Sequence, residues 1–218
     1  MKKSLFIAFL LGFVICLNPG IAQKKKSTSK TPEKKENGLS PATFHGLKFR
    51  SIGPAWQAGR ISDFAVNPQN HSEIYVGVSA GHVWKTTNNG TTWEPVFDKY
   101  GAYSIGCLRM DPDNPNVVWV GTGENNSQRQ LGYGDGVYKT EDGGQTWKNM
   151  GLKDSRQIGM IQVDPRNSDV VYVAAEGSIW GPGGDRGLYK TEDGGKTWTK
   201  VLSISENTGV NNIVFDPR

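Results

Sequence analysis

From residue 61 onward, apolar residues occur in short runs separated by Gly, Pro, Asn and Asp. The runs are rich in Val, Ile and aromatic side chains, as at residues 74–77, 117–120 and 170–173. Runs of this composition between turn-forming residues indicate β-strands. No window of this region has the sustained 3.6-residue period of an amphipathic helix. The pattern therefore predicts an all-β fold.

A segment of eight residues ending in Thr-Trp occurs three times, at residues 86–93, 140–147 and 191–198, and we call these segments octets 1, 2 and 3. Their tryptophans are 54 and 51 residues apart. Each octet follows a short apolar run. Its glycine allows a positive φ, and its Asp or Asn side chain can accept hydrogen bonds from turn amides. Each octet therefore predicts the turn of a β-hairpin whose Trp packs against the sheet.

Each octet belongs to a repeat of about 50 residues. An Asn-Pro or Asp-Pro pair precedes it at residues 67–68, 111–112 and 164–165, and a fourth unit opens at 212–217. One unit then reads strand, turn, strand, loop, strand, octet, strand, which is typical of a four-stranded antiparallel propeller blade. We predict an incomplete β-propeller over residues 43–218, with three complete blades and the start of a fourth. Because propellers close with about four to eight blades, we expect the remaining blades in the full-length protein.

The N-terminal region predicts export rather than a folded domain. Residues 1–22 combine Lys2 and Lys3 with an apolar run and a small-residue cleavage context, as in a signal peptide. Residues 23–42 are rich in Lys, Ser, Thr and Pro and predict a disordered basic linker. The apolar run is too short for a comfortable membrane span. We expect no stable membrane span after signal cleavage, and a secreted, periplasmic or cell-envelope location.

The formal net charge of +4 belongs to the signal and linker. Eight of the 25 Lys and Arg residues and two of the 21 acids precede residue 37, which leaves 17 basic against 19 acidic side chains. The predicted folded part is therefore slightly acidic. This balance gives no basic face for DNA or RNA, so we expect no nucleic-acid partner.

The sequence offers no support for a metal or a cofactor. His45, His71 and His82 lack the spacing of metal ligands, and the Gly-rich loops are followed by no helix that could hold a phosphate. Cys107 is the one cysteine left after signal removal, so no intramolecular disulfide can form. Its apolar neighbours predict a buried, unreactive thiol.

Two long loops carry most of the candidate ligand-binding residues. Residues 121–136 and 175–187 join the second and third strands of units 2 and 3. Long loops on a rigid scaffold commonly bind ligands, and their carboxylates, amides, arginines and tryptophan suit a carbohydrate or protein ligand. The alternative, that the loops pack on each other or on further blades, stays open. The candidates are Arg60, Glu124, Asn125, Asn126, Arg129, Glu176, Trp180, Asp185 and Arg186.

Glu124 and Glu176 are the candidate catalytic residues. Both follow the second strand of their unit, so we interpret them as occupying comparable places in adjacent blades. A pair of carboxylates is the minimum for glycoside hydrolysis. The sequence does not give the distance between them.

The octets fit Ser/Thr-x-Asp-x-Gly-x-Thr-Trp and closely resemble the Asp-box, or BNR repeat, of sialidases, xyloglucanases and sortilin-type receptors. Octet 1 departs from it with Asn88 at the Asp position. Residues 49–54, 59–61 and 119–126 resemble an exported bacterial family labelled sortilin N-terminal-like or glycosyl hydrolase. The resemblance implies octets that are structural anchors on the face away from the ligand. The implied anchors are Thr86, Asn88, Gly90, Trp93, Thr140, Asp142, Gly144, Trp147, Thr191, Asp193, Gly195 and Trp198.

The resemblance to xyloglucanases places Ser79 where that family has a catalytic Asp, and a serine cannot supply the carboxylate. We therefore expect an exported propeller segment that binds a carbohydrate or protein ligand without catalysis of its own. One alternative is a glycoside hydrolase of the xyloglucanase or sialidase type, whose remaining catalytic residues lie in blades absent from this chain. The other is a structural scaffold of the cell envelope.

Overall fold

A computed structural model describes Gly46, residues 59–126 and 131–216, and Arg218. The chain divides into two units, Met1–Phe49 and Arg50–Arg218, and every element below belongs to the second. The predicted signal peptide and basic linker lie outside the described residues, as does Arg129.

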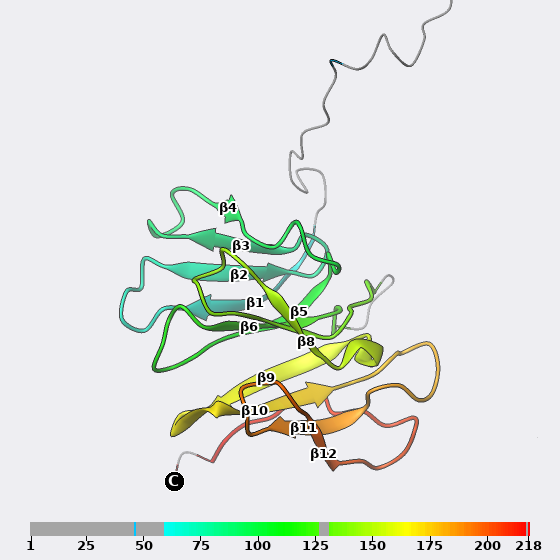
Figure 1. Ribbon diagram of the computed structural model, residues 1–218. Coiled ribbons are helices and arrows are strands. Elements are labelled where there is room, and N and C mark those ends of the chain that lie inside the picture. The colour runs from blue at the N-terminus through cyan, green and yellow to red at the C-terminus, as the bar shows by residue number, and fades with distance from the viewer. Residues whose placement is uncertain (1–45, 47–58, 127–130, 217) are drawn as a thin grey trace, which may run out of the picture. The chain divides into compact units, whose positions relative to one another are not determined.

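The described chain folds into three antiparallel sheets of four strands each, in the order of the sequence (Figure 1). We call the sheets blades 1, 2 and 3. Blade 1 holds β1 to β4, blade 2 holds β5 to β8 and blade 3 holds β9 to β12. The strands are β1 (Ile61–Val66), β2 (Ile74–Val78), β3 (Val83–Thr86), β4 (Glu94–Pro95), β5 (Ile105–Met110), β6 (Val118–Thr122), β7 (Val137–Thr140), β8 (Lys148–Gly151), β9 (Ile158–Asp164), β10 (Asn167–Ala175), β11 (Gly187–Thr191) and β12 (Thr199–Leu202).

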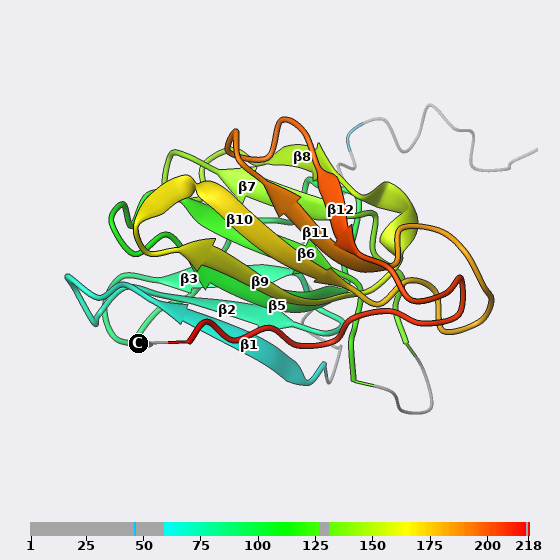
Figure 2. The ribbon, with the colours of Figure 1, turned by 90° about the horizontal axis from the view of Figure 1, so that it is seen from below.

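This arrangement confirms the predicted all-β fold and the blade repeat. The described residues contain no α-helix, and a single 3-10 turn (η2, Lys153–Ser155) leads into β9. The first strands of the blades, β1, β5 and β9, lie next to one another, and neighbouring blades pack through these strands (Figures 1 and 2).

Two hydrophobic clusters fill the spaces between the blades. The first joins blades 1 and 2 around Tyr75, Phe97 and Trp147, and the second joins blades 2 and 3 around Trp119 and Ile161. All five residues of β6 are buried, because blade 2 is covered on both faces. Cys107 lies in the second cluster, and its burial raises the pKa of the thiol far above the usual range, as expected for an unreactive cysteine.

The three octets form the same hydrogen-bonded turn. In octet 2, Thr140 Oγ1 donates to Asp142 Oδ1 at 2.7 Å and accepts from the Gly144 amide at 2.9 Å. Asp142 also accepts from the amide and the hydroxyl of Thr146, at 2.8 and 2.5 Å. The glycine at the fifth position has φ of +84° to +93° in the three octets, a conformation that favours glycine.

Octet 1 keeps this turn although Asn88 replaces the aspartate. Asn88 Oδ1 accepts from the Thr92 amide at 2.9 Å, and its Nδ2 donates to Thr92 Oγ1 at 2.9 Å. In octets 2 and 3, the threonine hydroxyl instead donates to the carboxylate. The amide therefore preserves the geometry by reversing one hydrogen bond.

The tryptophans of octets 2 and 3 connect neighbouring blades. Trp147 Nε1 donates to the Val96 carbonyl of blade 1 at 3.0 Å, and Trp198 Nε1 donates to the Met150 carbonyl of blade 2 at 2.7 Å. Trp93 has no preceding blade among the described residues, and it is 40% exposed against 6% for Trp147.

The predicted fourth unit lies against blade 3 without forming a strand in the described residues. The Val210 amide donates to the Ala175 carbonyl at 3.1 Å, Gln162 Nε2 donates to the Ile213 carbonyl at 3.1 Å, and Phe215 packs edge-on against Tyr172. The segment thus follows β9 as β9 follows β5, but no second strand pairs with it in the described part of the chain.

Candidate ligand-binding face

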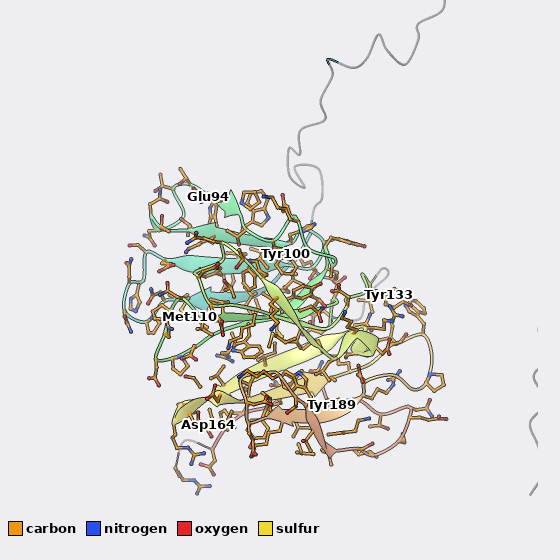
Figure 3. All side chains as sticks on the ribbon, viewed as in Figure 1. Glu94, Tyr100, Met110, Tyr133, Asp164 and Tyr189 are labelled. Carbon is orange, nitrogen blue, oxygen red and sulfur yellow. The ribbon has the colours of Figure 1, made fainter. Side chains whose placement is uncertain are left out.

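The antiparallel order of each blade sends its connections to two opposite edges. The octets and the Asn-Pro or Asp-Pro turns form one edge. Residues 79–82, 123–126, 131–136 and 176–186 form the other, which we call the loop face. Figure 3 shows Tyr133 on this side and Met110 and Asp164 on the opposite side. The long loops therefore lie away from the octets.

Arg60 and Glu124 form an ion pair that joins blade 1 to blade 2. Glu124 is only 5% exposed, and its amide donates to Ser104 Oγ at 2.9 Å and to the Gly132 carbonyl at 3.1 Å. Arg60 Nη2 also donates to the Asn126 carbonyl at 3.2 Å. The carboxylate is thus committed to a cation of the neighbouring blade.

Asn125 continues this bridge into the next blade. Its Nδ2 donates to the Gly159 carbonyl of β9 at 2.8 Å. The structure therefore brings four sequence candidates together, Arg60 with Glu124, Asn125 and Asn126, at the ends of the first strands.

Glu176 has a different partner. It accepts a hydrogen bond from Asn211, and burial raises the pKa of its carboxyl although the Asn211 bond opposes the shift. Its place in the blade also differs from that of Glu124. The amides of Ser79, Gly123 and Glu176 donate to the carbonyls of Arg60, Ser104 and Gln157, respectively, at 2.8 to 3.0 Å.

These bonds correct the sequence interpretation of the two glutamates. Glu176 is equivalent to Gly123 and Ser79, so Glu124 is one residue further along its blade. One residue reverses the direction of a side chain in an extended chain. Accordingly, Glu124 contacts the preceding blade and Glu176 contacts the segment that follows blade 3.

Arg186 holds the blade 3 loop together from the inside. Its buried guanidinium donates to the carbonyls of Glu176 at 2.9 Å and Gly183 at 3.0 Å, and also to those of Ser178 and Gly181. A single fork of N–H donors therefore closes the loop. Arg186 was a ligand-binding candidate, and the structure gives it this internal role.

Asp185 is likewise engaged within the fold. Its Oδ2 accepts from the Asp154 amide at 3.1 Å, and Tyr189 Oη donates to Oδ1 at 3.4 Å. Asp135 of blade 2 accepts from Tyr138 Oη at 2.6 Å in the same way. The Asp that ends each long loop thus fixes the loop to the following strand.

Exposed aromatic rings occupy the loop face above these networks. Trp180 is 65% exposed on the loop that Arg186 closes, and Tyr133 and Tyr103 are also exposed. The guanidinium of Arg156 lies 5.8 Å from the centre of the Tyr133 ring, and the Gly134 amide donates to the Arg156 carbonyl at 2.7 Å. Exposed aromatic rings can stack on the apolar faces of a ligand.

Sequence reasoning missed Tyr103 and Arg156. Both stand two residues before the first strand of a blade, and the signal that could have found them is this shared position on the loop-face connections. Among the described residues, no group of three or more His, Cys, Asp or Glu side chains is arranged to hold a metal ion. The same residues include no helix with the length and apolarity needed to cross a membrane.

Comparison with known sequences points to one group of enzymes. No family model matches the chain. It is 25% identical over 172 residues to a xyloglucanase of Acetivibrio thermocellus, and the aligned region covers 73% of this chain and 19% of that protein. It is 24% identical over 180 residues to a xyloglucanase of a Paenibacillus species, covering 76% and 17%. The chain thus spans about a fifth of the length of the curated relatives it matches.

Solved structures give the same fold. The chain superimposes on an ancestral GH74 enzyme with a TM-score of 0.58 at 21% identity, over 72% of this chain and 20% of that one. A GH74 enzyme of Niastella koreensis gives a TM-score of 0.50 at 21% identity, over 65% and 22%. Together with the three blades, these likenesses define the chain as part of a β-propeller with xyloglucanase-like relatives.

Proposed function

We propose that this chain is the Asp-box propeller segment of an exported protein and binds a polysaccharide across its loop face, without catalysis of its own. The observation that carries the proposal is the set of exposed rings Trp180, Tyr133 and Tyr103 above loops fixed by buried polar contacts. Sugar rings have apolar faces that stack on aromatic side chains and hydroxyls that bond to polar neighbours. The relatives named above make xyloglucan the first polysaccharide to test.

The test is the affinity of the protein for xyloglucan and a panel of other polysaccharides, measured by titration calorimetry. Trp180→Ala removes the most exposed ring, and we expect the Kd to rise about tenfold, or about 1.4 kcal/mol. Trp93→Ala is the matched control, because it removes the same residue type from the opposite edge. An unchanged Kd for Trp180→Ala, with the folded state intact by circular dichroism, would contradict the proposal. If the ligand is instead a protein, neither the unmodified protein nor Trp180→Ala binds the polysaccharides.

Glycoside hydrolysis is the second candidate function, and Glu176 favours it. Burial raises the pKa of this carboxyl, as a general acid requires. Glu124 fits that role less well because it is paired with Arg60. Ser79 supplies no carboxylate, so a second catalytic acid would have to come from another blade.

Release of reducing ends from the same polysaccharides separates the enzyme from the binding protein. Under the binding proposal, no reducing ends appear, and Glu176→Gln leaves polysaccharide affinity within about twofold. If sugar is released and Glu176→Gln abolishes the release, the chain takes part in hydrolysis.

A further inference from the structure

Arg156 of the loop face has a backbone conformation that favours glycine. Its φ is +69° and its ψ is −41°, and a residue with a side chain is strained in this region. Gly59 and Tyr103 hold the same position, two residues before β1 and β5, and neither has a positive φ. Of the three blades, blade 3 alone is therefore strained at this position.

The loop of blade 2 fixes the backbone of Arg156. The Arg156 carbonyl accepts a hydrogen bond from the Gly134 amide at 2.7 Å. Gly123 packs so closely against the same carbonyl that a side chain on Gly123 would collide with it. Because only the backbone of residue 156 takes part in both contacts, a glycine there would make them equally well and without strain. The turn itself thus gives no reason for an arginine.

The side chain of Arg156 is exposed beside an exposed ring. Its guanidinium lies 5.8 Å from the centre of the Tyr133 ring, within the range of a cation–π contact. Tyr133 is itself 45% exposed. Among the described residues, no carboxylate forms an ion pair with Arg156. The structure therefore presents a planar cation and an aromatic ring together to the solvent.

The acidic side chains of the neighbouring loops leave this cation available to a ligand. Three of their carboxylates are bonded to other groups of the fold, namely Glu124, Asp135 and Asp185. Asp154 lies on the same turn as Arg156, but its neighbour Lys153 is also exposed and carries the opposite charge. A negatively charged ligand group can therefore approach Arg156 without facing an excess of negative charge on this turn.

We propose that Arg156 binds an oxyanion of the sugar, a carboxylate or a sulfate, so that the loop face prefers acidic polysaccharides to neutral ones. This inference rests on the proposed function, because Tyr133 supplies the stacking surface for the same sugar. A guanidinium binds an oxyanion through two parallel N–H donors, and its plane can stack on an aromatic ring at the same time. The strain at residue 156 persists because binding, rather than the fold, requires the arginine.

The test compares charged and neutral forms of the same sugars by titration calorimetry on the full chain. An oligogalacturonate is paired with its methyl ester, and a sulfated oligosaccharide with its desulfated form, in about 0.15 M salt to screen contacts between distant charges. We expect at least one charged form to bind about tenfold more tightly than its neutral partner. The two pairs show which oxyanion is bound. Arg156→Gly should remove most of the difference.

Lys153→Ala is the matched control, because it removes one positive charge from the same turn and should keep the preference for the charged form. The urea midpoint of Arg156→Gly should not fall, because glycine adopts this conformation without strain. Circular dichroism verifies the folded state of both variants.

Equal affinity for the charged and neutral forms in both pairs would overturn this inference and leave polysaccharide binding intact. Absence of binding to all four sugars would overturn the proposed function as well. An equal loss of preference in Arg156→Gly and Lys153→Ala would show an effect of net charge alone. A preference that survives Arg156→Gly would place the anion elsewhere. A lower urea midpoint for Arg156→Gly would show that the side chain stabilises the fold, which also contradicts the proposal.

Discussion

Blades 1 and 2 are built from the same repeat, yet equivalent residues have very different surroundings. Phe64 is exposed where Leu108 is buried, and Trp93 is exposed where Trp147 is buried. The hairpin turns themselves are alike: the Gly90 and Gly144 amides both donate to the hydroxyl of the first threonine of their octet. The difference shows that the repeat specifies each hairpin locally, whereas the packing of its apolar residues depends on the neighbouring blade.

The two described interfaces also differ in their chemistry. Between blades 1 and 2, Tyr75 Oη and Lys85 Nζ both donate to the Gly143 carbonyl of octet 2, at 2.7 and 2.9 Å. Between blades 2 and 3, Trp119 takes the place of the tyrosine and packs against Gly195 of octet 3. A polar contact therefore joins octet 2 to blade 1, and an apolar contact joins octet 3 to blade 2 at the equivalent position.

The largest expected effect separates the buried and the exposed octet tryptophans. Trp147→Ala removes an indole that contacts Phe97 and donates to the Val96 carbonyl, and we expect a loss of about 3–5 kcal/mol in the free energy of unfolding. Trp93→Ala should cost about 1 kcal/mol or less, because much of the side chain is exposed. Urea denaturation followed by circular dichroism measures both changes. Equal losses for the two variants would show that Trp93 is as deeply packed as Trp147.

A smaller effect separates the octet glycines. Gly90 and Gly195 both have positive φ, so alanine strains either turn by about 1 kcal/mol or more. At Gly195, the new Cβ would also lie 2.7 Å from Trp119 Cη2, whereas at Gly90 it meets only its own Trp93 at 3.5 Å. We expect Gly195→Ala to cost about 1–3 kcal/mol more than Gly90→Ala.

Gly144→Ala offers an intermediate case, since its Cβ would lie 3.2 Å from Tyr75 Cε1. Thermal and urea midpoints of the three alanine variants should fall in the order Gly90, Gly144, Gly195, with Gly195→Ala the least stable. Three equal midpoints would mean that backbone strain alone determines the cost and that contact with the neighbouring blade adds nothing.

The sequence predicted the parts of the structure that are determined locally. Thr140, Asp142 and Gly144 fix the octet turn among themselves, so their spacing was enough to identify a hairpin. The repeated order of four strands per unit then predicted a propeller blade, because short β-branched runs between turns favour β-strands.

Side-chain direction on the loop face could not be predicted in the same way. Glu124 and Glu176 both follow a second strand, and a one-residue difference in their place in the blade sends them to different neighbours. Arg186 looked like a surface cation but turns inward to four carbonyls of its own loop. Such directions depend on the path of the folded loop, and spacing along the chain does not encode that path.

The smallest predicted effect concerns acid and again contrasts octets 1 and 2. The hydroxyl and amide of Thr146 lower the pKa of Asp142 to about 2, below about 4 in an unfolded chain. Because the folded pKa is the lower one, this carboxylate contributes stability above pH 4 that is lost as the pH falls toward 2. Asn88 of octet 1 carries no such charge. Asp142→Asn should therefore make the urea midpoint depend less on pH between 4 and 2, and Asn88→Asp should make it depend more. If neither variant changes that pH dependence, the octet carboxylate does not couple protonation to folding.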